Sequence, residues 1–333
     1  MPRTPRNRIA ADKGGSPDAR QAHASDSATF LIHPVLPFRL DLTVWALRRR
    51  PGNLIDQWDG ETYRRVLIVD EMPFEITVAQ NVNRSRAVRV TIHGKISDSR
   101  TKKAIRQAVE NAFGMRVDLS SFYRFCARDS RLAPLVRRFE GLKPPRFFSV
   151  FDGLINGIAC QQLSLSLGIQ LLNRLAQNFG RPAPGGDPLA YTFPRPCDLA
   201  HCHPMELRRL GFNFRKARAI IEISQAIVEG KLNLEKCASL SDQEALQQLM
   251  ELHGIGRWTA EYTLLRGMGR WHIFPEGDQG ARNGLKRWLH LHGAFDTKRE
   301  QRVLAAWEPF GGLIYFHMLM KGLDEAGHLA LDP

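Results

Sequence analysis

Two patterns of hydrophobic and polar positions divide the chain near residue 143. Before this point several segments alternate with a period of two, which is typical of strands with one buried face. Helical spacing is found in RTKKAIRQAVENAFGM (100–115), and VWALRRRPGNLIDQW (44–58) could form a short helix. Strands mixed with helices predict an α+β domain over residues 30–143. The alternating segments are FRLDLTV (38–44), RRVLIVD (64–70), FEITVAQ (74–80) and AVRVTIHG (87–94).

Helical spacing prevails after LKPPR (142–146), a linker whose two prolines cannot continue a helix. We therefore predict an all-helical domain over residues 144–330, opening with one long helical stretch that ends at Gly180. A later helix is expected to begin with a capping box, in which Ser241 and Glu244 satisfy each other's backbone amides. Residues 1–29 have no apolar pattern and predict a disordered basic tail.

The formal net charge is +13, and residues 1–29 contribute only +2 of it (five basic, three acidic), which leaves about +11 on the rest. Such a balance favours an anionic polymer as partner, nucleic acid first and a membrane surface second. The excess of Arg over Lys could also reflect genome composition. No apolar run has the length of a membrane span, and the first residues lack the core of a secretory signal. We expect no membrane contact and a location in the cytoplasm or nucleoid, or in the nucleus of a eukaryote.

Five cysteines are an odd number without the spacing of a disulfide framework. A group of four potential metal ligands lies close together, but its spacing matches no common zinc pattern. We therefore expect ordinary loop residues at Cys197, His201, Cys202 and His203.

The segment LHGIGRWTAEY (252–262) carries the most specific signal. A helix is predicted to end near Leu252, the chain to turn through Gly254 and Gly256, and a new helix to start near Arg257. The outward amides of such a turn and the new helix dipole form an anion site. Main-chain contacts of this kind hold a phosphate without reading base sequence. The alternative is an ordinary corner between two helices.

Together with FPEGDQGARNGL (274–285), this segment resembles the helix-hairpin-helix DNA glycosylase superfamily, and within it the 3-methyladenine DNA glycosylase II branch. IACQQLS (158–164) and LRRLGFNFRKARAIIEISQAIVEGKL (207–232) support the resemblance, which covers residues 145–325. The α+β part is similar, more weakly, to the TATA-binding-protein-like N-terminal domain of that branch. The resemblance implies double-stranded DNA as partner, a monomer, and no organic cofactor.

The resemblance places the catalytic carboxylate at Asp278. A carboxylate there would stabilise the positive charge of an oxocarbenium-like sugar and position water. The alternative is that Asp278 only caps the following helix. Bifunctional members carry a nucleophilic Lys where this chain has Trp258, so no Schiff base is expected. The predicted enzyme is monofunctional and leaves an abasic site.

Three residues are predicted to line the base pocket. Trp258 and Tyr262 lie one helical turn apart, and an aromatic face attracts a cationic alkylated purine by ~1–2 kcal/mol when desolvated. The alternative is that both are core residues. Leu319 matches the position where some members carry a second pocket Trp. This difference leaves base preference open among 3-methyladenine, 7-methylguanine, hypoxanthine and uracil.

The remaining predicted contacts involve DNA and one cation. In the family, a plug residue from the turn equivalent to CQQLS (160–164) here fills the gap left by the extruded base. Gln162 is our first choice, with Gln161 and Leu163 as alternatives, although a glutamine could also pack locally. The hairpin resembles those that hold a monovalent cation, Na⁺ or K⁺, through backbone carbonyls. The carbonyls would be those of Met250, Leu252 and Ile255; the DNA backbone would contact Gly254, Gly256, Arg257 and Thr259.

The predicted function is therefore excision of alkylated purines of the 3-methyladenine and 7-methylguanine type from duplex DNA. Two alternatives stay open. One is a glycosylase for deaminated bases such as hypoxanthine and uracil. The other is a non-catalytic DNA-binding protein, because helix-hairpin-helix units also occur purely as DNA grips.

Overall fold

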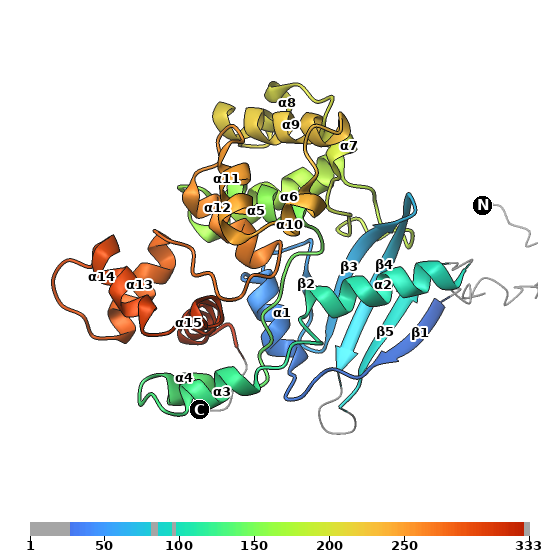
Figure 1. Cartoon of the computed structure of the whole chain (residues 1–333). Helices are drawn as coiled ribbons and strands as arrows, with labels where there is room; N and C mark the ends of the chain where they lie inside the picture. The colour runs from blue at the N-terminus through green and yellow to red at the C-terminus, as the bar shows by residue number, and fades with distance from the viewer. Residues whose placement is uncertain (1–26, 81–85, 95–97, 330–333) are drawn as a thin grey trace, which may run out of the picture.

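An antiparallel five-stranded sheet forms one side of the molecule, with strand order β1-β5-β4-β3-β2 (Figure 1). The computed structural model describes residues 27–80, 86–94 and 98–329. Most of the predicted tail, residues 1–26, lies outside the described residues. The strands are β1 (Ser27–Ile32), β2 (Gln57–Trp58), β3 (Thr62–Val69), β4 (Met72–Gln80) and β5 (Val88–His93).

Helices make up the rest of the regular structure. Those of the first half are α1 (Leu40–Arg48), α2 (Ser99–Ala112), α3 (Ser120–Cys126) and α4 (Leu132–Arg138). The helices from residue 150 onward are α5 (Val150–Cys160), α6 (Leu165–Phe179), α7 (Pro196–Leu199), α8 (Pro204–Arg209), α9 (Phe214–Val228), α10 (Leu234–Ala238), α11 (Asp242–Met250), α12 (Arg257–Arg266), α13 (Gln279–Trp288), α14 (Thr297–Ala305) and α15 (Gly311–Glu325). Three of the four predicted strands, the helix α2 and the capping box of Ser241 with Glu244 are confirmed.

The strand predicted at FRLDLTV is wrong, because these residues run into helix α1. Its alternating apolar residues are all buried, but they face two cores. Leu40 and Val44 pack against the sheet, whereas Leu42 and Ala46 pack among helices of the other half. A helix buried on opposite sides can therefore imitate the period of a strand. The sheet also starts earlier than predicted, because Ser27, the first residue of β1, already pairs with β5.

The single long helix predicted to end at Gly180 is also wrong. The chain breaks between α5 and α6 at a four-residue turn, Gln161 to Ser164. Gln162 has a φ of 53°, in the left-handed region, which an α-helix cannot contain. The hydroxyl of Ser164 then caps α6 by accepting from the amide of Leu167. We call residues 161–164 the plug turn.

Helices α3 and α4 pack with the last helices of the chain rather than with the sheet (Figure 1). The ring of Phe122 on α3 lies 5.5 Å from that of Phe310 and 5.2 Å from that of His317 on α15. A second core, formed around α5, α6 and α9 to α12, fills the upper part of the helical half. The helical half therefore has two lobes, and α1 lies between the lower lobe and the sheet.

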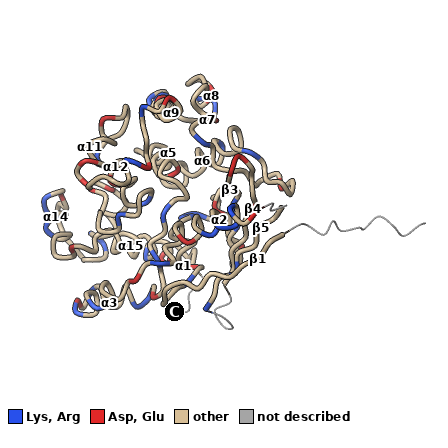
Figure 2. Tube along the Cα trace, turned by 45° about the vertical axis from the view of Figure 1, so that its right-hand side comes forward, with Lys and Arg blue, Asp and Glu red and all other residues tan. Residues whose placement is uncertain are grey.

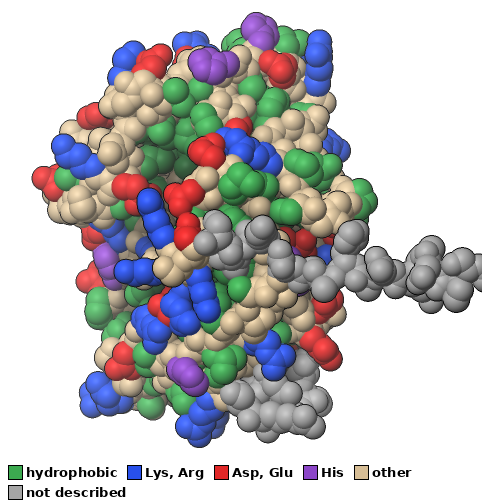
Figure 3. Space-filling view, turned by 90° about the vertical axis from the view of Figure 1, so that its right-hand side faces the viewer, with side chains coloured by type: hydrophobic (Ala, Val, Ile, Leu, Met, Phe, Trp, Pro, Cys, Tyr) green, Lys and Arg blue, Asp and Glu red, His purple; other side chains and the backbone are tan. Residues whose placement is uncertain are grey.

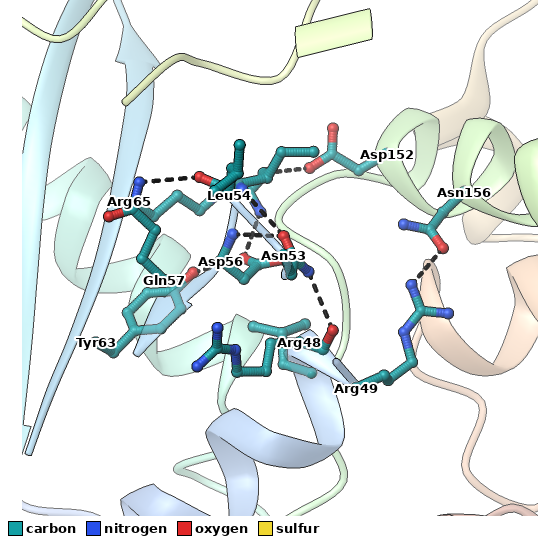
Figure 4. Close-up of polar contacts among 12 residues, drawn as sticks. Arg48, Arg49, Asn53, Leu54, Asp56, Gln57, Tyr63, Arg65, Asp152 and Asn156 are labelled. Atoms are coloured by element: carbon teal, nitrogen blue, oxygen red, sulfur yellow. Dashed lines mark hydrogen bonds and ion pairs between the residues drawn. The ribbon is translucent and has the colours of Figure 1, made fainter. Parts of the chain in front are cut away.

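A buried network of polar side chains joins the two halves (Figure 4). Arg65 on β3 donates to Asp56 at 2.7 Å and to Asp152 on α5 at 2.5 Å, and its guanidinium lies over the ring of Phe148. Further along, Arg266 on α12 donates to the carbonyl of Ala46 at the end of α1. The halves are thus fixed to each other by charged and hydrogen-bonded groups that are largely buried.

The basic residues are spread over both halves and alternate with acidic ones (Figure 2). On the side of the molecule seen in Figure 3, basic, acidic and hydrophobic side chains are interspersed in small patches. That side therefore does not form one continuous basic surface among the described residues. Within the described part of the chain, no helix is long and apolar enough to cross a membrane.

Stability is expected to fall on mild acidification because of His317. This side chain is buried against Phe122 and Phe139, its Nδ1–H donates to the carbonyl of Leu313, and its Nε2 is without a partner. Burial lowers the pKa of His317 from 6.5 to about 4. Between these values the unfolded chain binds a proton that the folded chain does not, so stability is lost as pH falls through this window.

From pH 7 to pH 5 this one group costs about 2 kcal/mol in the free energy of unfolding. Urea unfolding of the wild type and of His317→Phe at both pH values measures it. The difference between the two pH values should be smaller in the variant by that amount. Equal pH dependence in both proteins would refute the role of His317.

Candidate active site

The hairpin between α11 and α12 has the geometry of an anion site. Gly254 has a φ of 81°, and a Cβ at this position would lie 3.0 Å from that of Ala219 on α9, so a glycine is required. Gly256 is the N-cap of α12 and provides no side chain to accept from the amides that follow. The first amides of α12 are therefore left to an external acceptor such as a phosphate.

The other predicted DNA contacts differ in how they are placed. Arg257 is exposed, but its guanidinium is paired with Glu261 at 2.8 Å and with Glu276 at 3.0 Å. Thr259 is only 2% exposed, and its hydroxyl accepts from the side chain of Gln161. The Thr259 side chain is thus out of reach of DNA, and only main chain near it can face a phosphate.

A cavity of about 870 Å³ opens beside the hairpin, between α12, α13 and α15. Its walls bring together the residues predicted for catalysis and the base pocket: Asp278, Trp258, Tyr262 and Leu319. The plug turn borders the same cavity through Leu163, which is 38% exposed. Gln162 is exposed at the tip of that turn, whereas Gln161 points toward the hairpin.

Asp278 serves two purposes at the start of α13. Its Oδ1 accepts from the amide of Ala281 at 2.9 Å and caps the helix. Its Oδ2 accepts from Nε1 of Trp258 and from the hydroxyl of Tyr315, each at 3.1 Å. Burial and the nearby Asp278 raise the pKa of Tyr315 well above its usual value, so its hydroxyl remains a donor. The carboxylate is therefore held in one orientation on the cavity wall.

Trp258 and Tyr262 form the aromatic side of the cavity, with ring centroids 5.3 Å apart and planes at 31°. Tyr262 is also a core residue, since it is only 2% exposed and packs against Phe147. Tyr262 therefore both lines the cavity and belongs to the core. Its hydroxyl accepts from Nη1 of Arg49 at 2.8 Å and donates to Asn156 at 3.3 Å.

Sequence reasoning missed three residues of the site: Tyr315, Arg49 and Asn156. Tyr315 precedes Leu319 by one helical turn on α15, so the spacing could have indicated it. Arg49 is the C-cap of α1, with a φ of 62°, and both it and Arg50 line the cavity. No signal in the chain connects these arginines with a site more than two hundred residues later.

The described residues contain no group of three or more His, Cys, Asp and Glu side chains that could hold a metal ion. All five cysteines are free thiols, including Cys197 and Cys202 of the local cluster. At the hairpin, the carbonyl of Leu252 accepts from the amide of Ile255 at 3.1 Å. A carbonyl oxygen has a second lone pair, so this bond leaves room for a cation.

A comparison with family models identifies the helical half. Residues 155–309 match the model described as HhH-GPD superfamily base excision DNA repair protein, where HhH stands for helix-hairpin-helix. The chain carries an HhH-GPD superfamily domain. The HhH-GPD domain contains the hairpin, Trp258, Tyr262 and Asp278, whereas Tyr315 and Leu319 follow it.

Known proteins resemble the chain over different lengths. YfjP of Bacillus subtilis is 34% identical over 167 residues, which are 49% of this chain and 55% of YfjP. The DNA-3-methyladenine glycosylase of Bacillus subtilis is 23% identical over 84% of this chain and 93% of its own length. The chain therefore spans little more than half of the first relative and nearly all of the second.

A solved structure shares the fold. The 3-methyladenine DNA-glycosylase from Archaeoglobus fulgidus superposes with a TM-score of 0.76 at 24% identity, covering 90% of this chain and 100% of that chain. The sheet and the helical half thus occur together in the fold of another protein.

Proposed function

We propose that the protein is a monofunctional DNA glycosylase that removes alkylated purines from duplex DNA in base excision repair. The observation that supports this most is the placement of Asp278, which Trp258 and Tyr315 orient on the wall of an aromatic cavity. The cavity lies beside the hairpin, where the N-terminus of α12 has no side-chain cap. The names of the relatives point to the same class of activity.

Each part of the site has a role in the hydrolysis. The amides at the start of α12 hold a phosphate, and the extruded purine enters the cavity against Trp258. The bond from C1′ to the ring nitrogen breaks, and its electron pair neutralises the cationic base, so no proton donor is needed. Asp278 faces the positive sugar and orients the water. The water adds to C1′ and releases a proton, and a free base and an abasic site result.

The first experiment uses duplex DNA treated with a methylating agent. Incubation with the protein should produce abasic sites, counted as alkali-labile breaks, and chromatography should identify released 3-methyladenine and 7-methylguanine. Parallel duplexes with hypoxanthine or uracil test the deaminated-base alternative. Tight binding with no base released from any duplex would leave only the non-catalytic DNA grip.

A lysine on the cavity wall gives a sharper test of the monofunctional proposal. Lys321 on α15 lines the cavity, and its ammonium is paired with Glu325 at 2.6 Å. An ammonium in an ion pair is a poor nucleophile, so borohydride should trap no covalent protein–DNA adduct, and strand breaks should appear only after alkali. An adduct that disappears in Lys321→Ala would instead identify a lyase.

Further parts of the proposal concern the surroundings of the site. We infer a TATA-binding-protein-like N-terminal domain, supported by its antiparallel sheet with a long helix, α2.

The proposed cation at the hairpin would be held by the carbonyls of Met250, Leu252 and Ile255, and Na⁺ or K⁺ would only stabilise the turn. Choline chloride at equal ionic strength should then weaken DNA binding. We also propose that the protein is a monomer. It would act in the compartment that holds the DNA, which is the cytoplasm or nucleoid, or the nucleus of a eukaryote.

A further inference from the structure

The plug turn is tied to its surroundings by two side chains that take no part in the proposed chemistry. Lys216, in the first turn of α9, is only 6% exposed, and its ammonium donates to the carbonyl of Ala159 at 3.0 Å and to that of Gln161 at 2.6 Å. These carbonyls lie where α5 ends, and the last carbonyls of a helix have no partner within it. Lys216 therefore caps α5 with a positive charge.

The second tie runs from the plug turn to the hairpin. Nε2 of Gln161 donates to the carbonyl of Gly254 at 3.0 Å and to the hydroxyl of Thr259 at 2.8 Å. One residue thus connects three elements, because its carbonyl binds α9 while its side chain binds the hairpin. The residue that follows it, Gln162, takes the left-handed conformation and is exposed.

The start of α6 closes the turn from the other side. A Cβ at Gly168 would lie 2.7 Å from Sγ of Cys160 and 3.1 Å from its Cα, so α6 packs directly against the end of α5. The base of the plug turn is therefore held on three sides, whereas the side chains of its tip, Gln162 and Leu163, are exposed.

We infer that Lys216 and Gln161 are positioning residues for duplex opening. They fix the distance between the tip that replaces the extruded base and the hairpin that holds the phosphate. This inference rests on the proposed function. Without these ties the tip could move relative to the hairpin, so filling the gap would no longer stabilise the extruded nucleotide. Loss of these ties should therefore slow the opening of the duplex, whereas the rate at which the glycosidic bond then breaks should be unchanged.

The test compares two DNA substrates that carry the same 7-methylguanine. In one, the lesion is paired with cytosine; in the other, it lies in a single-nucleotide bulge, where extrusion breaks no pair. Lys216→Met should excise the paired lesion about 10- to 100-fold more slowly than wild type, as expected for hydrogen bonds to a charged group. On the bulged lesion, the excision rate of Lys216→Met should be within about 3-fold of the wild-type rate. Gln161→Leu should show the same difference between the two substrates.

Two further variants separate positioning from folding. Lys216→Arg keeps the charge and should restore most of the activity on the paired lesion. Lys231→Met makes the same chemical change just after α9, at a lysine whose side chain is 73% exposed and paired with Glu229, and it should act as wild type. The fluorescence of a 2-aminopurine next to the lesion should rise when wild type binds and should rise less with Lys216→Met. This signal reports the unstacking of bases and is independent of bond breaking.

Each outcome decides the matter. Equal losses on paired and bulged DNA would make Lys216 a merely structural residue, and unchanged activity on both would show that the ties are irrelevant. If wild type brightens 2-aminopurine but releases no base from either substrate, the proposed function fails, and this inference fails with it.

Discussion

Replacing Asp278 with asparagine is expected to slow base release by about 10²- to 10³-fold, the usual cost of removing one preorganised electrostatic group. Asparagine keeps the oxygen that accepts from the amide of Ala281, and it caps a helix as well as aspartate does. The substitution removes the charge and alters the oxygen that meets Trp258 and Tyr315. Chemistry should therefore be lost while the fold is retained.

The chain provides a matched control in Asp296, which caps α14 by accepting from the amide of Arg299 at 2.8 Å. Asp296→Asn makes the same chemical change at a helix start away from the cavity, and it should release bases at the wild-type rate. Both variants should bind abasic-site DNA as wild type does. If Asp278→Asn retains activity, the carboxylate is only a cap, and the catalytic group must be sought elsewhere on the cavity wall.

Local features of the fold followed from the sequence where one side of an element is buried. The strands β3, β4 and β5 have one face on a core, so their period of two was visible. The helix α1 was misread for the opposite reason. It is packed on two sides, with Leu40 against the sheet and Leu42 against helices, and no local rule separates that case from a strand. The break after Cys160 was not visible in the apolar pattern, because apolar residues continue on both sides of it, and only the resemblance implied a turn at CQQLS.

The site was predictable where its residues lie close together in sequence. The hairpin and Asp278 fall within 25 residues of each other, so their spacing is informative. Arg49 and Asn156 reach Tyr262 from other elements, and only tertiary packing brings them there. Gln161 is one of the predicted plug residues, but its side chain points toward the hairpin and away from the tip of the plug turn. The direction of a side chain at a turn depends on backbone angles that the residue type does not fix.

A second large effect is expected at the junction between the two halves. Arg65→Met should lower the free energy of unfolding by about 3–5 kcal/mol, because it leaves buried carboxylates without their counter-charge. Asp56 also accepts from the hydroxyl of Tyr63 at 2.8 Å, but that neutral donor cannot offset two negative charges. Urea unfolding at pH 7.5 measures the change, and Arg64→Met is the control.

Arg64 is the neighbouring residue on β3, with 42% of its side chain exposed and partners in Glu75 and Asp187. Exposed pairs contribute about 0–1 kcal/mol, but the side chain of Glu75 is only 11% exposed, so this control should lose less than Arg65→Met, on the order of 1–2 kcal/mol. Adding Asp56→Asn and Asp152→Asn to Arg65→Met should recover part of the loss, since a neutral site needs no counter-charge. Equal stability of the Arg65 and Arg64 variants would mean that water reaches the junction.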